Sequence, residues 1–424
     1  MGGLEYKMKI YIKTFGCRVN QVESEALLEN CLQKGFTSAD DIKQADLCLL
    51  NTCAVTHRAE RDAKKEIRTI LRQNPRAKII ITGCCAKVRK EALEKEFPSL
   101  KIILKDDVAS FLFGREIDWS VKAHSGKTRA FVKIQDGCNN FCSYCIVPFA
   151  RPIKTSKPKE IVLEEIQNLI KNGYREIVLS GINIGNYLCP KSGANLAVLL
   201  SEICALEGNF RIRFSSIELN TITDDLLEAA QTAGKKFCPY LHIPLQSGSS
   251  KVLKEMNRKY DAPQYIKRLK EIKDSIKEIA FFTDVIAGFP TETEQDFKQT
   301  LALIEQVKFA GLHVFSYSKR EGTSAALMKQ LPSSVIKERS IILHSLDKKL
   351  RQDFALSLKG QKQDFLAEEY VPSKKVLSGV LANFARAEIA CLEQQKTPCG
   401  VFEVEITDAK DGVCLAKRTA GRVC

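Results

Sequence analysis

From residue 9 to about residue 118, short apolar runs alternate with amphipathic stretches. The pattern predicts strands at 9–13, 46–50 and 78–82, and helices at 21–33 and 57–73. Five residues fall on one stripe of the second helix, as packing on a sheet requires: Ala59, Ala63, Ile67, Ile70 and Leu71. Strands that alternate with helices indicate βαβ units and a parallel sheet, so we expect an N-terminal α/β domain over residues 8–119.

The same alternation resumes after a polar stretch at 120–128. The predicted strands are 130–135, 176–179, 211–215, 241–244, 281–286 and 312–316, and the predicted helices are 159–172, 194–206, 224–233, 262–278 and 293–308. A long helical pattern at 333–358 closes the region. Six β/α units predict a parallel barrel, complete or partial, over residues 124–358, with its chemistry at the carboxyl ends of the strands.

Polar and apolar residues alternate in the last segment, 361–424, where Asp411-Gly412 is a turn signal. This pattern predicts a small antiparallel β-barrel. The expected fold class is therefore α/β, with an N-terminal parallel α/β domain, a central β/α barrel and a C-terminal β-barrel.

The charge of the chain favours a polyanionic partner. Among 424 residues, 65 are Lys or Arg and 51 are Asp or Glu, which gives a formal charge of +14. No run of about 18 apolar residues is present, and the first residues lack the apolar core of a signal peptide, so we expect a cytoplasmic protein with no membrane segment. Sixteen cysteines in a reducing compartment then indicate metal or redox chemistry rather than disulfides.

Cys138, Cys142 and Cys145 form the sharpest motif, a C-x3-C-x2-C loop directly after a predicted strand. Zinc is one candidate for this loop, but structural zinc takes four Cys or His ligands, and residues 146–149 offer no fourth one. Three thiolates with one open position suit a 4Fe-4S cluster better. The loop therefore favours an iron–sulfur cluster whose unique iron is free to bind another ligand.

This loop resembles the cluster loop of the radical S-adenosylmethionine enzymes. The resemblance implies that the open iron binds S-adenosylmethionine, and that electron transfer releases a 5′-deoxyadenosyl radical. It also implies that Tyr144 lies beside the adenine, for which simple packing is the alternative. The implied contacts to the rest of the cofactor, each with a structural alternative, are Ser180, Gly181, Asn183, Arg213, Ser215 and Glu218.

Three further cysteines, Cys17, Cys53 and Cys84, each follow one of the first three predicted strands. Ligands of an open parallel sheet bind outside the carboxyl ends of its strands, so these thiols are expected to converge at one edge. Three unrelated cysteines are the alternative, because cysteine is common in protein interiors. The shared position favours a second three-cysteine cluster, with Cys85 as a competitor for Cys84.

These motifs together resemble the methylthiotransferases of the radical S-adenosylmethionine superfamily. The matching segments are 15–20, 51–55, 82–86, 135–151, 213–218, 238–249, 254–259, 283–290 and 313–318. The resemblance implies two 4Fe-4S clusters: one on Cys138, Cys142 and Cys145 makes the radical, and one on Cys17, Cys53 and Cys84 supplies or carries the inserted sulfur. It further implies a TRAM-like RNA-binding domain at 361–424, a tRNA substrate and an electron donor that the sequence does not identify.

Within the family, residues 16–21 (GCRVNQ) resemble the branch that acts on threonylcarbamoyladenosine in tRNA, next to the anticodon. Two alternatives stay within the enzymes: methylthiolation of isopentenyladenosine in tRNA, or of an aspartate in a ribosomal protein. A non-catalytic, metal-stabilised RNA-binding protein is the alternative from another class. Two three-cysteine sets, each short of a fourth ligand, argue against that class, because a structural metal site is normally closed.

Two residues depart from the family pattern beside the sites. Pro152 follows Arg151 where the family usually has glycine, and Lys87 stands where it tends to have glutamine. Basic residues also gather after both cysteine sets, with 11 Lys or Arg against three acids between 57 and 90. A second run holds Arg151, Lys154, Lys157 and Lys159. We expect these runs to guide a phosphate backbone, although a solvated helix face is the alternative.

Overall fold

The computed structural model describes residues 7–117, 119–124, 128–391 and 400–419. Contacts divide the chain into two compact units. The first unit contains residues 1–121, 136–155 and 320–323, and the second contains 122–135, 156–319 and 324–424. The cysteine loop at 138–145 therefore packs with the N-terminal unit, although the sequence placed it in the barrel region. The three predicted domains stay a prediction.

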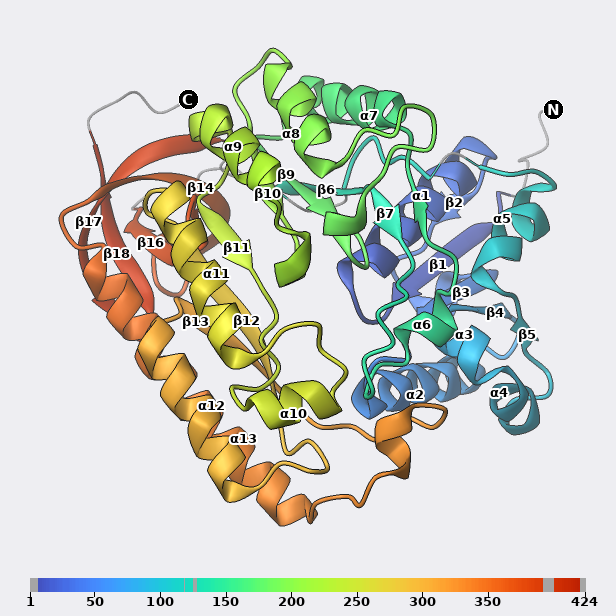
Figure 1. Ribbon diagram of the computed structural model, residues 1–424. Helices are drawn as coiled ribbons and strands as arrows, with labels where there is room; N and C mark the ends of the chain where they lie inside the picture. Colours follow the sequence, from blue (N-terminus) through green and yellow to red (C-terminus); the bar gives the residue numbers. More distant parts are fainter. Residues whose placement is uncertain (1–6, 118, 125–127, 392–399, 420–424) are drawn as a thin grey trace. The chain divides into compact units, whose positions relative to one another are not determined.

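A five-stranded parallel sheet with strand order β2-β1-β3-β4-β5 forms the centre of the first unit (Figure 1). Its strands are β1 (Lys9–Thr14), β2 (Thr37–Ser38), β3 (Leu47–Thr52), β4 (Lys78–Gly83) and β5 (Lys101–Ile102). Its helices are α1 (Arg18–Gln33), α2 (His57–Gln73), α3 (Cys84–Val88), α4 (Lys90–Glu96), α5 (Lys105–Phe113) and α6 (Val147–Ala150).

Helices cover both faces of this sheet. On one face, Leu49 of β3 packs in a cluster with Leu27 of α1 and Val108 of α5. On the other face, Leu50 packs in a cluster with Ile67 of α2. Every residue of β3 is buried, as expected for a central parallel strand covered on both sides.

The second unit begins with an open arc of parallel strands (Figure 1). Its strands are β6 (Arg129–Lys133), β9 (Glu176–Ser180), β10 (Arg211–Phe214), β11 (Tyr240–His242), β12 (Ala280–Ala287) and β13 (Gly311–Ser316). They form two sheets, β10-β9-β6 and β11-β12-β13, which parallel bridges such as Ser216–His242 connect. Within the described residues β6 does not pair with β13, so the predicted β/α barrel is a partial one.

Helices follow the strands of the arc and pack on its outer face. They are α7 (Lys159–Lys171), α8 (Leu196–Ala205), α9 (Asp224–Ala233), α10 (Ser250–Glu255), α11 (Ala262–Ser275), α12 (Glu294–Val307) and the long α13 (Ser333–Ser357). The short strands β7 (Gln135–Asp136) and β8 (Thr155–Ser156) lie where the chain passes from one unit to the other.

Five strands close a small barrel at the C-terminal end of the second unit. They are β14 (Lys362–Val371), β15 (Val376–Leu381), β16 (Arg386–Ala390), β17 (Val401–Lys410) and β18 (Val413–Arg418), in the order β14-β15-β16-β18-β17. Four strand pairs are antiparallel, as predicted, and the pair β16–β18 is parallel. An odd number of strands cannot close with every neighbour antiparallel, so one parallel pair is required.

Candidate functional site

Cys17, Cys53 and Cys84 lie at the same edge of the first unit's sheet. Cys17 is the residue before α1, just beyond the end of β1. Cys53 directly follows β3, and Cys84 begins α3 directly after β4. The strands β1, β3 and β4 are neighbours in the sheet and run parallel, so the three cysteines leave its carboxyl edge side by side.

Two glycines bring the flanking loops against the chain around Cys53. Gly16 has φ +93°, and a Cβ at this position would lie 2.5 Å from Sγ of Cys53. Gly83 has φ +90°, and a Cβ there would lie 2.5 Å from the carbonyl oxygen of Thr52. Any larger residue would push the loops apart, and both backbone angles favour glycine. The segments that carry Cys17 and Cys84 are thus both packed closely on the segment that carries Cys53.

The side chain of Arg151 joins two of the thiols. Its Nε donates to Sγ of Cys84 at 3.2 Å, and its Nη2 donates to Oδ1 of Asn20 at 2.8 Å. The thiol of Cys17 in turn donates to the same Asn20 oxygen, at 3.7 Å. The neighbouring Cys85 is buried in the apolar cluster beneath α2, and burial raises the pKa of its thiol to about 12. The contact with Arg151 therefore favours Cys84 over Cys85 as the site residue.

Arg151 belongs to a buried group of four charges. Its Nη1 lies 2.8 Å from the carboxylates of both Glu23 and Asp136, and Lys105 is also paired with both acids. Arg151 is only 5% exposed. Burial alone would lower its pKa, but Glu23, with smaller contributions from Cys84 and Asp136, raises the pKa well above the usual value. The guanidinium therefore stays charged beside the sulfur of Cys84.

Burial raises the pKa of two of these thiols, Cys17 and Cys53. The pKa of Cys53 is raised to about 11, chiefly by burial and further by the charges that Cys17 and Cys84 would carry. A metal centre among them would reverse this preference, because thiolates lose their protons when they bind a cation. Convergent thiols with a charged N–H donor beside one sulfur fit the iron–sulfur centre that the sequence predicts here.

Arg151→Met is expected to lower the free energy of unfolding of the first unit by about 3–5 kcal/mol, because it leaves Glu23 and Asp136 buried with a single cation. The fluorescence of Trp119, the one tryptophan of the chain, reports on this unit during denaturant unfolding. Arg68→Met is the matched control. Arg68 pairs with Glu96, but its side chain is 63% exposed, so the expected cost is about 0–1 kcal/mol. An equal loss of unfolding free energy in the two variants would contradict the view that Arg151 neutralises buried carboxylates.

The loop of Cys138, Cys142 and Cys145 lies in the same unit. All three cysteines are partly exposed. A turn brings the N–H of Cys145 to the carbonyl of Cys142 at 2.9 Å, and the N–H of Asn140 donates to Sγ of Cys138 at 3.5 Å. Tyr144, inside the loop, is half-buried. Three partly exposed cysteines within eight residues fit the cluster predicted for this loop.

The predicted contacts to S-adenosylmethionine in the second unit are of two kinds. Ser180 ends β9, with Gly181 and Asn183 directly beyond it, and Ser215 directly follows β10. Among the described residues, both polar atoms of the Asn183 side chain and Oγ of Ser215 are buried without a hydrogen-bond partner. Buried polar groups are normally paired, so these atoms at the carboxyl ends of two strands fit a polar ligand that the family implies.

Arg213 and Glu218 are engaged within the protein. Arg213 is fully buried; it donates to Glu176 at 2.7 Å and to the carbonyls of Leu381 and Ala382. These internal partners give Arg213 a structural role, and its predicted contact with the cofactor stays a prediction. Glu218 accepts from Arg258 at 2.5 Å and keeps part of its side chain exposed.

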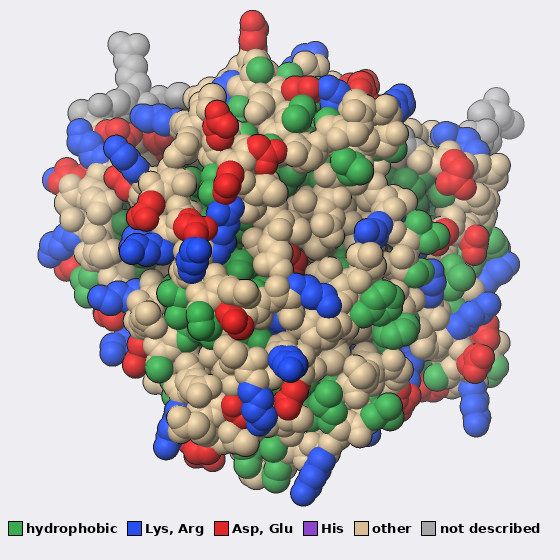
Figure 2. Space-filling model, viewed as in Figure 1, with side chains coloured by type: hydrophobic (Ala, Val, Ile, Leu, Met, Phe, Trp, Pro, Cys, Tyr) green, Lys and Arg blue, Asp and Glu red, His purple; other side chains and the backbone are tan. Residues whose placement is uncertain are grey.

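The basic run after the cysteine loop is exposed only in part. Arg151 is buried, Lys157 is paired with Glu165 and Lys159 is paired with Glu202, whereas Lys154 is exposed. The face shown in Figure 2 mixes Lys and Arg with Asp and Glu rather than gathering them into one basic patch. Exposed cations do follow one another along α2, namely Arg58, Arg61, Lys65, Arg68 and Arg72. The helix α2 is therefore a candidate for contacts with a phosphate backbone, with Arg58 and Arg68 also forming ion pairs, to Asp62 and Glu96.

The network of Asn20, Glu23, Asp136 and Arg151 was not predicted from the sequence as a unit. Asn20 belongs to the GCRVNQ segment and Arg151 to the cysteine loop, so both positions carried a motif signal. Their contact joins residues 131 positions apart in the chain, which no local pattern indicates.

Comparisons with known proteins identify two matching families and several relatives. Residues 9–105 match the family described as Uncharacterized protein family UPF0004, and residues 132–304 match the Radical SAM superfamily. The chain is 38% identical, over 86% of its length and 88% of the relative, to a threonylcarbamoyladenosine tRNA methylthiotransferase of Chlamydia pneumoniae. It is 34% identical, over 85% of its length and 88% of the relative, to a tRNA-2-methylthio-N(6)-dimethylallyladenosine synthase of Thermodesulfovibrio yellowstonii.

Among solved structures, the radical S-adenosylmethionine methyltransferase TsrM of Kitasatospora setae is similar in fold. The TM-score is 0.55 with 13% identity, and the match covers 73% of each chain. No helix among the described residues is both long and apolar enough to cross a membrane. The superfamily match implies S-adenosylmethionine and one 4Fe-4S cluster as cofactors. On the extent and identity of these matches, the chain belongs to the radical S-adenosylmethionine methylthiotransferase family.

Proposed function

We propose that this enzyme is a tRNA methylthiotransferase that attaches a methylthio group to carbon 2 of N6-threonylcarbamoyladenosine, next to the anticodon. The observation that carries the substrate is the identity of 36–38% to three relatives named for threonylcarbamoyladenosine. The segment GCRVNQ at 16–21 points to the same branch. Relatives named for dimethylallyladenosine reach 34–37%, so that nucleoside is the second candidate.

Two sets of thiols divide the work in this proposal. Cys138, Cys142 and Cys145 hold a 4Fe-4S cluster, and Asn183 and Ser215 offer buried polar atoms to S-adenosylmethionine. Cluster and cofactor together supply a radical able to remove hydrogen from an unactivated C–H bond. Tyr144 stays a proposed neighbour of the adenine, and Ser180 and Gly181 are proposed to shape the cofactor pocket.

Cys17, Cys53 and Cys84 are proposed to hold a second 4Fe-4S cluster that presents the sulfur. The contribution of the chain is to fix these ligands: Gly16 and Gly83 pack their loops together, and Arg151 donates to Cys84. A charge-assisted N–H donor beside a ligand sulfur stabilises negative charge on it and tunes the centre. Three protein ligands leave a position on this cluster for the sulfur that is transferred.

The proposed partner is tRNA, in the cytoplasm, with an electron donor outside this chain. The exposed cations of α2 support contact with the phosphate backbone, and the C-terminal barrel is proposed to act as a TRAM-like RNA-binding domain.

Mass spectrometry of nucleosides tests the substrate. In tRNA from cells that lack this protein, 2-methylthio-N6-threonylcarbamoyladenosine is expected to disappear and its precursor without the methylthio group to accumulate. Expression of the wild-type chain should restore the product, and expression of Cys142→Ala should not. Loss of the methylthio derivative of dimethylallyladenosine instead would select the second candidate. An unchanged profile would exclude both tRNA nucleosides and point to a substrate such as a ribosomal-protein aspartate.

A further inference from the structure

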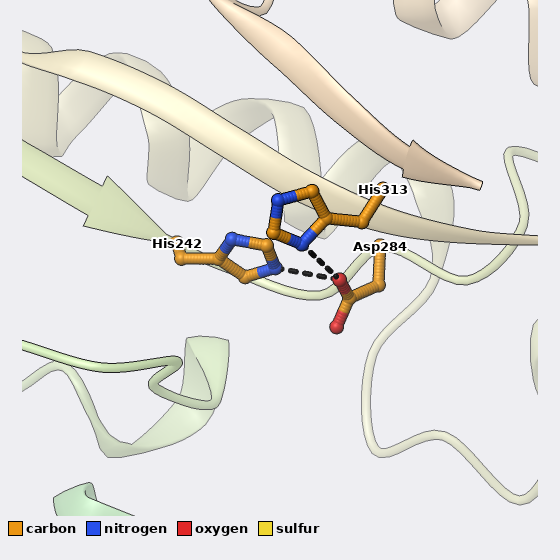
Figure 3. Close-up of side chains that lie close together, drawn as sticks. All are labelled: His242, Asp284 and His313. Atoms are coloured by element: carbon orange, nitrogen blue, oxygen red, sulfur yellow. Dashed lines mark hydrogen bonds and ion pairs between the residues drawn. The ribbon is translucent and has the colours of Figure 1, made fainter. Parts of the chain in front are cut away.

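Two histidines and an aspartate meet on the arc of strands in the second unit. They lie in segments that resemble the family, but none of them has been proposed above as a cluster ligand or a cofactor contact. His242 ends β11, Asp284 lies on β12 and His313 lies on β13. Asp284 and His313 are register partners on neighbouring parallel strands, so their side chains leave the same face of the sheet. Figure 3 shows both imidazoles turned toward the carboxylate of Asp284.

The donor atoms of these three residues surround one point. Nε2 of His242 lies 2.7 Å from Oδ1 of Asp284, and Nδ1 of His313 lies 3.4 Å from the same oxygen. All three donor atoms lie within 4.8 Å of one another, and the two ring centroids are 4.7 Å apart. Metal–ligand bonds of about 2.0–2.2 Å separate neighbouring donors by roughly 2.9–3.5 Å. Small adjustments of the side chains would therefore admit a cation among them.

Exposure rises steadily across the cluster. The side chain of His242 is 5% exposed, that of Asp284 is 20% exposed and that of His313 is 48% exposed. A cation held here would be enclosed by protein on the side of His242 and open on the side of His313. Three protein ligands that leave open positions are typical of a metal site that binds a further ligand, whereas a structural site is closed by four.

Hydrogen bonding alone explains this arrangement less well. Two imidazole N–H groups that only neutralised an aspartate could be shared between its two oxygens. Here both rings approach the same oxygen, which gathers two nitrogen donors and one carboxylate oxygen on one side of the sheet. Two imidazoles and one carboxylate are the donor set of open sites for Fe²⁺, and they also suit Zn²⁺ and Mn²⁺.

We propose that His242, Asp284 and His313 bind one divalent transition-metal cation. This site is distinct from both cysteine sets, because its donors are nitrogen and oxygen. The inference does not rest on the proposed nucleoside substrate, since the binding of the cation is measured without it.

Mn²⁺ is a suitable probe, because it prefers oxygen and nitrogen donors and binds thiolates poorly. The full chain, with its iron–sulfur centres reconstituted, is freed of loosely held metal with a chelator and titrated with Mn²⁺. The electron paramagnetic resonance signal of free Mn²⁺ then counts the bound ions. We expect one tightly bound Mn²⁺ per chain. His313→Gln and Asp284→Asn are each expected to weaken Mn²⁺ binding by at least about 10-fold. Loss of a residue that only hydrogen-bonds a metal ligand already lowers metal affinity by about that factor, and loss of the ligand itself should lower it at least as much.

His344→Gln is the matched control, because His344 is an exposed histidine on α13 outside the cluster. This variant is expected to bind Mn²⁺ like the wild type. His313 is half-exposed, so its replacement should leave the fold intact, as circular dichroism checks. Absence of a tight Mn²⁺ site in the wild type, or equal binding by wild type and His313→Gln, would overturn the proposal and leave a hydrogen-bonded cluster only. Failure of the proposed function would instead appear in the nucleoside profile, with Mn²⁺ binding unchanged.

Discussion

Cys142→Ala protein, reduced with dithionite and supplied with S-adenosylmethionine, is expected to release no 5′-deoxyadenosine above a cluster-free blank. Cys142 is the middle member of the loop set, and a backbone hydrogen bond from the N–H of Cys145 to its carbonyl places the two residues in one turn. Without this thiolate the loop offers only two ligands, too few for a cluster that must also keep one iron open. Chromatography of the reaction mixture measures the product directly.

Iron content separates this effect from general unfolding. The wild type should hold about eight irons per chain if both clusters are 4Fe-4S, and Cys142→Ala should hold about four. Cys204→Ala is the matched control, since Cys204 is a half-buried cysteine on α8 outside both sets. It should keep the iron and the release of 5′-deoxyadenosine. Release at the wild-type rate by Cys142→Ala would refute the role of the loop.

The periodic parts of the fold could be predicted from the sequence. The helix α2 occupies the predicted residues, because an apolar stripe runs its whole length and Thr56 caps its first turn. The strands β2 and β5 have two residues each, which is too short for any pattern to indicate them. The helix α1 begins at Arg18, before the predicted start, because its first residues pack at the site rather than on an apolar stripe.

The candidate site could be predicted only in part, because part of it depends on contacts between residues far apart in the chain. The order of strands and cysteines along the chain is local information, and it was enough to place Cys17, Cys53 and Cys84 at one sheet edge. Burial and partners are tertiary information. Arg151 was predicted to face a phosphate backbone, yet it is buried against carboxylates from other segments of the chain. Arg213, predicted to contact the cofactor, is likewise engaged with a carboxylate, that of Glu176. A basic residue near a motif does not reveal whether its charge is used inside the protein or outside it.

Cys17→Ala is expected to have the opposite selectivity to Cys142→Ala: it should keep the release of 5′-deoxyadenosine and lose the methylthio product. The sulfur of Cys17 contacts Asn20 on the following helix and, through that amide, Arg151. Its removal takes a thiolate from the set at the sheet edge and leaves the loop of Cys138, Cys142 and Cys145 unchanged. The measurement pairs 5′-deoxyadenosine release with mass spectrometry of a tRNA substrate in the same reaction.

Cys85→Ala is the control that separates the roles of neighbouring thiols in the first unit. Cys85 follows Cys84 in α3 and belongs to the same apolar cluster beneath α2, but no described hydrogen bond joins it to Arg151. Cys85→Ala should therefore retain the methylthio product, with a loss of stability of about 1 kcal/mol for the smaller side chain. Methylthio product from Cys17→Ala at the wild-type level would show that the sulfur does not come from this edge of the sheet. Loss of the methylthio product in Cys85→Ala but not in Cys84→Ala would show that Cys85, and not Cys84, is the cluster ligand.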